Sequence, residues 1–176
     1  MKKLPKILSI DEYHKLLAYV KLRKPCRWEQ YYLAMVLGFE AGMRLSEILG
    51  YKDKVPSLTK DKIDFEANTI RIESGKGSKD RIVPLPKGFK RKHSDMLPLD
   101  LSRRALQDFV TKLGLKVLDK RLFFHMFRHG FATHYYNRSK DIVGLQNMLG
   151  HSRLDTTQVY THVNPEEVIR KARELF

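Results

Sequence analysis

Apolar residues recur at intervals of three and four along much of the chain, the pattern of helices that bury one face. Ser9 and Glu12 have the spacing of a capping box, so a first helix is predicted to begin there. A second helix is predicted over about residues 28–41, and Gly42 ends or bends it. The same pattern predicts further helices over residues 44–49, 101–115, 121–137, 139–149 and 165–175.

The periodicity changes to two in the middle of the chain, which indicates strands. The predicted strands are residues 63–65, 69–72 and 81–83, with the glycine-rich residues 75–78 as the hairpin loop between the last two. Residues 87–98 are basic and rich in breakers, and we expect them to be irregular and exposed. The sequence therefore predicts an α+β fold, mostly helical with a small antiparallel β-sheet, as one domain over residues 1–176.

Charge narrows the choice of partners. Lysine and arginine number 34 against 20 aspartates and glutamates, a formal net charge of +14, and a domain this basic commonly binds a polyanion. Charge alone does not separate DNA, RNA and membrane surfaces. The single cysteine, Cys26, excludes an internal disulfide and fits a reducing compartment. Neither a signal peptide nor an apolar run of about 20 residues is evident, so we expect a cytoplasmic protein that does not enter a membrane.

Two segments in the first half of the chain carry candidate chemistry. Arg44 follows a glycine at a helix start, and Glu47 lies three residues later on the same helical face, where it could hold the guanidinium. The predicted hairpin carries Lys76 between two glycines, followed by Lys79 and Arg81. A lysine at such a tip can reach a phosphate, although the P-loop pattern is missing.

Two further segments lie in the second half. His125 and Arg128 are three residues apart, so one helical face presents a fixed charge and a group that exchanges protons near neutral pH. His151 follows a helix-ending glycine, and Tyr160 lies nine residues further on. A metal site at His125 with other histidines, His129 and His134, is disfavoured because no acidic ligands accompany them.

The order of these segments resembles that of the tyrosine recombinase, or phage integrase, family. The stretches Ala-Gly-Met-Arg-Leu-Ser-Glu, Gly-Lys-Gly-Ser-Lys-Asp-Arg, His-Met-Phe-Arg-His and Leu-Gly-His, followed by a tyrosine, are similar to its conserved boxes. The resemblance covers nearly the whole chain and is nearest to Xer-like and archaeal integrases. It implies a site-specific recombinase or integrase that cleaves double-stranded DNA, forms a 3′-phosphotyrosine link and rejoins strands, with no metal, cofactor or ATP.

The resemblance also implies roles for individual residues. Tyr160 would be the nucleophile, and Arg44 and Arg128 would bind the non-bridging phosphate oxygens. Lys76 would be the general acid. The remaining implied roles are Lys79 as an alternative acid and DNA contact, Arg81 as a DNA contact, His125 in acid–base support, His151 on the phosphate, and Glu47 as a buttress.

One departure from the family concerns architecture. Family members usually carry a separate N-terminal domain that clamps the DNA, and no counterpart precedes the first predicted helix. We expect either an excised fragment or a natural minimal protein. Residues 165–176 form an apolar-faced helix that could pack on its own domain or dock on a neighbouring protomer of a tetramer.

Two other functions stay open. A type IB topoisomerase uses similar chemistry, but the family position of His125 is typically lysine in those enzymes. A non-catalytic DNA-binding regulator of recombination would explain the missing clamp, whereas the complete set of catalytic residues argues against it.

Overall fold

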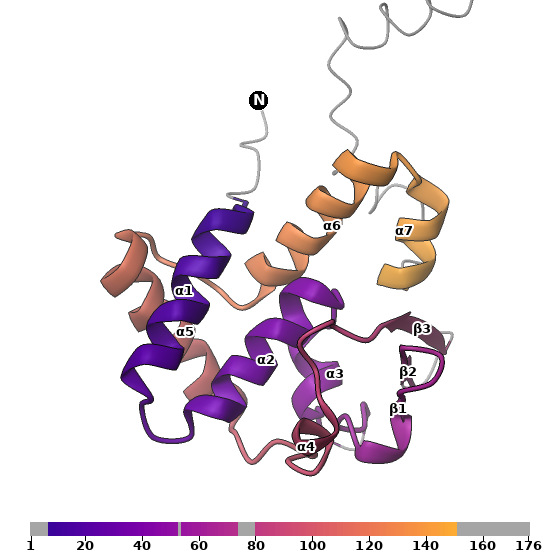
Figure 1. Cartoon of the computed structure of the whole chain (residues 1–176), viewed down its shortest axis with the longest axis horizontal. Helices are drawn as coiled ribbons and strands as arrows, with labels where there is room; N and C mark the ends of the chain where they lie inside the picture. The colour runs from indigo at the N-terminus through magenta and orange to yellow at the C-terminus, as the bar shows by residue number, and fades with distance from the viewer. Residues whose placement is uncertain (1–6, 53, 74–79, 151–176) are drawn as a thin grey trace, which may run out of the picture.

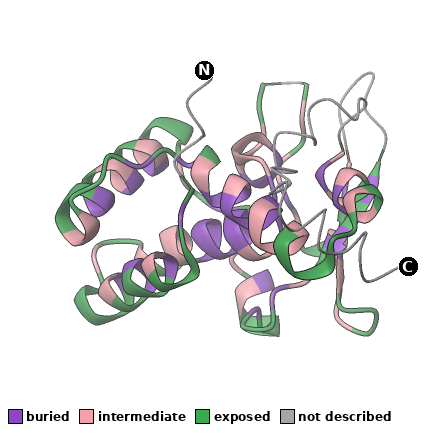
Figure 2. Ribbon diagram, turned by 90° about the horizontal axis from the view of Figure 1, so that it is seen from above, coloured by how far each residue is buried: buried purple, intermediate pink, exposed green. Residues whose placement is uncertain are grey.

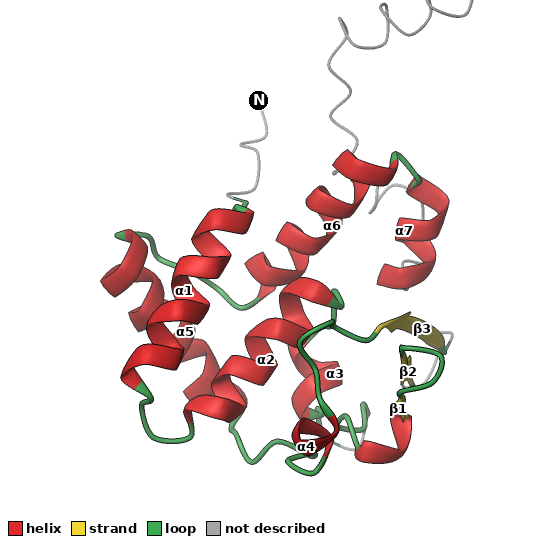
Figure 3. Cartoon of the chain, in the orientation of Figure 1, coloured by secondary structure: helices red, strands yellow, loops and turns green. Residues whose placement is uncertain are grey.

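The computed structural model describes residues 7–52, 54–73 and 80–150 of the 176-residue chain. Helices dominate it, and a small sheet lies to one side (Figures 1 and 3). The elements in chain order are α1 (Ile10–Arg23), α2 (Trp28–Glu40), α3 (Leu45–Leu49), the 3₁₀ turn η1 (Lys60–Lys62), β1 (Ile63–Asp64), β2 (Thr69–Ile72), β3 (Arg81–Pro84), α4 (Arg91–Ser94), α5 (Arg103–Leu118), α6 (His125–Ser139) and α7 (Ile142–Leu149). This confirms the predicted mostly helical α+β fold.

The first helix begins as the capping box predicts. The Glu12 amide donates to the Ser9 hydroxyl at 3.1 Å, and the Ser9 amide donates to the Glu12 carboxylate at 3.0 Å. Helix α7 is capped in a similar way, because the Gly144 amide donates to the Asp141 carboxylate at 2.8 Å. Gly150, with a φ of 63°, ends α7.

Helix α6 begins at His125 rather than at residue 121 as predicted. Tertiary hydrogen bonds hold the preceding residues out of the helix: the Thr111 hydroxyl donates to the Leu122 carbonyl at 2.9 Å, and the Phe124 amide donates to the Gln107 side chain at 3.1 Å. These partners lie on α5, so helical periodicity could not reveal them.

The expectation that residues 87–98 are irregular and exposed is wrong in part. The short helix α4 lies in this range, and both Phe89 and Ser94 are buried. Phe89 belongs to the main core and lies beside Phe65, with ring centroids 6.4 Å apart. The basic residues around it therefore cover an apolar anchor. The helix predicted over residues 165–175 lies outside the described residues.

The predicted sheet is confirmed as an antiparallel sheet in the order β1-β2-β3. Ile70 pairs with Val83 and Ile72 with Arg81. Ile70, Ile72 and Val83 are all buried, as expected for a sheet with one face on the core. The hairpin loop at residues 74–79 lies outside the described residues.

Helix α2 forms the centre of the molecule. Its residues from Leu33 to Phe39 are all buried, and α1, α3 and α6 contact it (Figures 1 and 2). Its sequence is apolar on every side, as a helix surrounded by others requires. A smaller cluster of Phe131, Ala132, Leu145 and Leu149 joins α6 to α7. None of the helices in the described ranges has the length and apolarity needed to cross a membrane.

Two glycines allow α2 and α6 to approach closely. A Cβ atom on Gly38 would lie 2.9 Å from the Phe124 ring, and one on Gly130 would lie 2.5 Å from the Phe39 ring and 3.2 Å from the Leu8 carbonyl. Each glycine thus accommodates an aromatic ring from the facing segment. Because α6 carries His125 and Arg128, this contact sets where those side chains lie.

We expect Gly130→Ala to lower the free energy of unfolding by about 1–3 kcal/mol, because the added methyl group overpacks the contact with Phe39. This loss should exceed the gain of about 1 kcal/mol that alanine brings to a helix. Urea denaturation measures the change. Gly88→Ala is the control, since its added Cβ would meet only the Tyr32 hydroxyl, at 4.0 Å. A Gly130→Ala protein as stable as the parent would contradict the close contact.

Candidate active site

A pocket of about 280 Å³ lies where the start of α3, the start of α6 and one face of α5 meet. Its lining residues are Met43, Arg44, Leu45, Ser46, Arg103, Gln107, Phe123, Phe124, His125 and Arg128. The structure thus brings together Arg44, His125 and Arg128, although about 80 residues of chain separate the first from the other two.

Arg44 occupies the N-cap position of α3. Its backbone amide donates to one Glu47 carboxylate oxygen at 2.7 Å, and its guanidinium Nη1 donates to the other at 2.9 Å. The Arg44 side chain stays 35% exposed, so part of the guanidinium faces the pocket. Glu47 therefore fixes the guanidinium, as the spacing of three predicted.

Arg128 is the most deeply buried of the candidate residues, at 2% exposure. Its Nη1 donates to the Gly42 carbonyl and its Nη2 to the Leu149 carbonyl, each at 2.6 Å. Gly42 has a φ of 65°, and a Cβ there would lie 2.5 Å from the Phe131 ring. Only glycine fits at this position, because the left-handed backbone and the nearby Phe131 ring both exclude a side chain.

His125 lies at the start of α6 and lines the pocket, with part of its side chain open to solvent. Partial burial and the charges of Arg128 and Arg44 lower the pKa of His125. Its ring meets that of His129 edge-on, with centroids 4.2 Å apart. Burial, with His125 and Arg128 nearby, lowers the pKa of His129 to about 4. Both imidazoles are therefore neutral near pH 7.

The alternative hypothesis was a metal site formed by His125, His129 and His134. His134, its third candidate, shares a hydrogen bond of 3.1 Å between its Nε2 and the Leu8 carbonyl. In the described ranges, no group of three or more His, Cys, Asp or Glu side chains is placed to hold a metal ion.

Arg81 does not lie on the surface, so its assignment as a DNA contact needs correction. Its side chain is 5% exposed. Its Nη2 donates to Glu47 at 2.8 Å, and its Nε donates to the Met148 carbonyl at 2.6 Å. Both partners are distant in sequence, which is why the hairpin pattern alone suggested an exposed basic residue.

Glu47 is thus the shared anion between Arg44 and Arg81. Burial raises the pKa of its carboxyl, but the hydrogen bond and charge of Arg81, the Arg44 amide and the charge of Arg128 outweigh that effect and lower the pKa to about 2. The carboxylate is therefore ionised throughout the physiological pH range.

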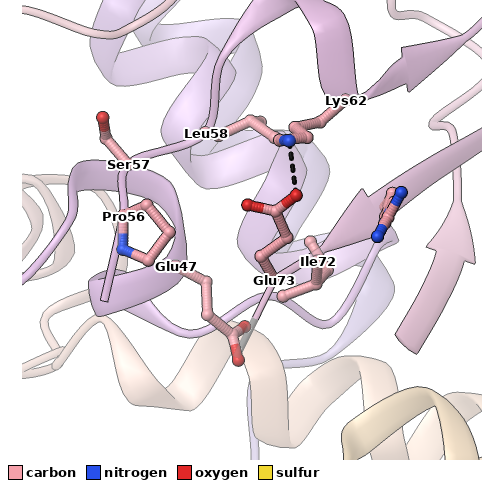
Figure 4. Close-up of a pocket in the computed structure, with 8 residues that line it drawn as sticks. Glu47, Pro56, Ser57, Leu58, Lys62, Ile72 and Glu73 are labelled. Atoms are coloured by element: carbon pink, nitrogen blue, oxygen red, sulfur yellow. Dashed lines mark hydrogen bonds and ion pairs between the residues drawn. The ribbon is translucent and has the colours of Figure 1, made fainter. Parts of the chain in front are cut away.

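Two ion pairs lie beside the sheet. Lys62 pairs with Glu73, which directly follows β2 (Figure 4). Arg71 pairs with Asp80 at 3.4 Å. Figure 4 also shows the Glu47 carboxylate directed away from the Lys62–Glu73 pair. The predicted residues Lys76, Lys79, His151 and Tyr160 lie outside the described residues.

Arg103 and Gln107 are among the lining residues of the pocket that sequence reasoning missed. Gln107 also holds the Phe124 amide directly before His125, at 3.1 Å. A glutamine in the middle of an amphipathic helix gives no signal of such a role. Arg103 follows the N-cap Ser102, and its guanidinium lies over the Tyr51 ring at 4.6 Å.

Among curated proteins, the chain is 34% identical to the tyrosine recombinase XerA of Thermococcus onnurineus, over 98% of this chain and 63% of that protein. It is 32% identical to the tyrosine recombinase XerD of Staphylococcus aureus, over 95% of this chain and 61% of that protein. The chain thus spans somewhat less than two thirds of the length of these relatives.

Solved structures of the same fold include a crystal structure of XerA recombinase, with a TM-score of 0.69 and 25% identity over 99% of this chain and 66% of that chain. The catalytic domain of bacteriophage HP1 integrase matches over 95% of this chain and 93% of its own length, with a TM-score of 0.62 and 23% identity. The model of the Phage integrase family matches residues 6–97 and 96–167. The chain therefore belongs to the phage integrase family.

Proposed function

We propose that this chain is the catalytic domain of a site-specific DNA recombinase or integrase that cleaves and rejoins strands through a phosphotyrosine at Tyr160. The observation that carries the proposal is the pocket in which Arg44, His125 and Arg128 meet. It combines two fixed positive charges with an uncharged imidazole in a chain of the phage integrase family.

Arg44 and Arg128 suit the binding of a phosphodiester under attack. The transition state of phosphoryl transfer gathers negative charge on its non-bridging oxygens, and fixed donors stabilise that charge without reorganisation. Arg44 is tied to Glu47 yet partly exposed, so it can donate to a phosphate oxygen. Arg128 lies deeper and supplies positive charge from the pocket wall.

The proton transfers fall to other groups. The Tyr160 oxygen would attack phosphorus and lose its proton, while the bond from phosphorus to the 5′-oxygen breaks. Lys76 would donate a proton to that leaving oxygen, with Lys79 as the alternative on the same loop. His125 is neutral near pH 7, so it can accept or relay a proton, and His151 would hydrogen-bond the phosphate. A freed 5′-hydroxyl from a partner strand would reverse the steps.

Double-stranded DNA is the proposed partner. The net charge of +14 favours a polyanion, and one structure of the same fold is that of XerH recombinase bound to its difH substrate, at a TM-score of 0.70 and 24% identity. Strand exchange needs several protomers on the DNA, and we propose that residues 165–176 contribute to that assembly.

Covalent trapping tests the chemistry. Incubated in EDTA with a pool of nicked suicide substrates, the protein should form an adduct with DNA that resists SDS. Tyr160→Phe should abolish the adduct, because it removes the attacking oxygen, whereas Tyr136→Phe on α6 should retain it. Gel electrophoresis of labelled DNA provides the measurement.

The outcomes separate the open functions. DNA binding without an adduct on any substrate would contradict the catalytic proposal and favour a non-catalytic regulator. An adduct that leads only to relaxation of supercoiled plasmid, without strand exchange, would favour a topoisomerase-like activity. An adduct that survives Tyr160→Phe would refute the choice of nucleophile.

A pH series tests the role of Glu47 as the buried anion. Its pKa is about 2 in the folded protein and near 4.5 when unfolded, so its ionisation stabilises the fold fully above pH 5, and that contribution fades as the pH falls towards 2. Glu47→Gln should lose roughly 3 kcal/mol of unfolding free energy at pH 7, and less at pH 3.

The comparison comes from denaturant unfolding of the parent protein and of Glu47→Gln at several pH values. Glu66→Gln, at an exposed position in the turn after β1, controls for the loss of one negative charge. A deficit for Glu47→Gln that is the same at pH 3 and pH 7 would contradict the pairing of Glu47 with the arginines.

A further inference from the structure

Arg81 connects three parts of the molecule from a buried position. It is the first residue of β3, paired with Ile72 across the hairpin. Its guanidinium donates to Glu47 on α3 and to the Met148 carbonyl at the end of α7. The family resemblance implies only a DNA contact for Arg81, and the proposed chemistry does not use it.

We propose that Arg81 is a positioning residue, which fixes the end of α7 relative to Arg44 at the pocket. The inference rests on the proposed function, because its consequence for catalysis assumes cleavage at this pocket.

The end of α7 is held by two arginines from different elements. Arg81 donates a hydrogen bond to the Met148 carbonyl, and Arg128 donates one to the next carbonyl, that of Leu149, both at 2.6 Å. The last carbonyls of a helix have no partner within it and carry partial negative charge, so guanidinium donors there are favourable. Together the two arginines fix the position and direction of the helix end.

Gly150 lets Arg81 come this close. A Cβ on Gly150 would lie 3.0 Å from the Arg81 Cδ and 3.2 Å from its Nη1, and the φ of 63° already disfavours other residues. Nη1 is buried and has no hydrogen-bond partner among the described residues. The side chain is therefore packed against the point where the chain leaves α7 and continues to His151.

The same guanidinium reaches the arginine that faces the pocket. Glu47 accepts from Arg81 with the oxygen that also accepts the Arg44 amide, while its other oxygen accepts from the Arg44 guanidinium. A shift of Arg81 would therefore move Arg44 as well as α7. Because Arg81 is the first residue of β3, that strand is tied to the same point.

Lysine cannot replace this arrangement. The planar guanidinium directs Nε and Nη2 to two acceptors that lie on different elements, whereas an ammonium group is a single point of charge. Arg81→Lys keeps the charge and should retain the fold. It can make only one of the two contacts, either with Glu47 or with the Met148 carbonyl. Arg81→Met removes both contacts at similar side-chain length.

The test compares Arg81→Lys and Arg81→Met with the parent and with Arg71→Met, which removes one charge from an exposed position on β2. At saturating DNA, and well below the melting temperature of each variant, we expect the rate of adduct formation to fall about 100-fold in Arg81→Met and at least about tenfold in Arg81→Lys. The dissociation constant for DNA should change less than about threefold, and Arg71→Met should retain the parental rate.

Amide hydrogen exchange provides a readout independent of catalysis. Exchange at the end of α7, at Leu149 and Gly150, should become at least about tenfold faster in both Arg81 variants, while that of α1 stays unchanged. Parental exchange at α7 in the folded Arg81→Lys protein would overturn the proposal, and so would a parental cleavage rate. A loss of rate fully explained by the unfolded fraction would also overturn it. If the parent forms no adduct, the proposed function fails, and the exchange rates alone decide the role of Arg81.

Discussion

The carboxylate of Glu47 is the contact on which the arrangement of the pocket depends. It is the one anion among Arg44, Arg81 and Arg128 in the described structure, and it is almost wholly buried. Charges taken out of water are costly unless they are paired and hydrogen-bonded. Glu47 meets that condition because it accepts three hydrogen bonds, two from Arg44 and one from Arg81. Without it, three like charges would be gathered in a protein that already carries a large positive excess.

Backbone carbonyls supply the rest of the compensation. Arg128 has two of them, and Arg81 has one, all at 2.6 Å. The carbonyls come from the turn at Gly42 and from the end of α7, so the fold has placed helix ends and a tight turn where cations need acceptors. Burial of Arg128 is thus inseparable from the left-handed turn at Gly42 and from the close packing of α2 on α6.

How much could be predicted depended on the range of the contacts. Local signals sufficed for the capping box at Ser9, the glycine end of α7, and the pair of Arg44 with Glu47, because each involves residues within a few positions. The hairpin was found from its alternation. Long-range contacts were not accessible: Glu47 and Met148, the partners of Arg81, are 34 and 67 residues away from it, and the buried Phe89 anchors a stretch that looked like surface. Patterns of one element show which face is apolar, but not which partner satisfies a buried charge.

The charges that suit the pocket to a phosphate also set the state of its histidine. Burial, together with the charges of Arg128 and Arg44, lowers the pKa of His125 and so favours its neutral form. A neutral imidazole can take a proton, and an approaching phosphate would offset the arginine charges and make protonation easier. The same arginines would then bind the substrate and, once it is bound, allow His125 to gain a proton. Under the proposed function, fixed charge and proton transfer would thereby be coupled through electrostatics.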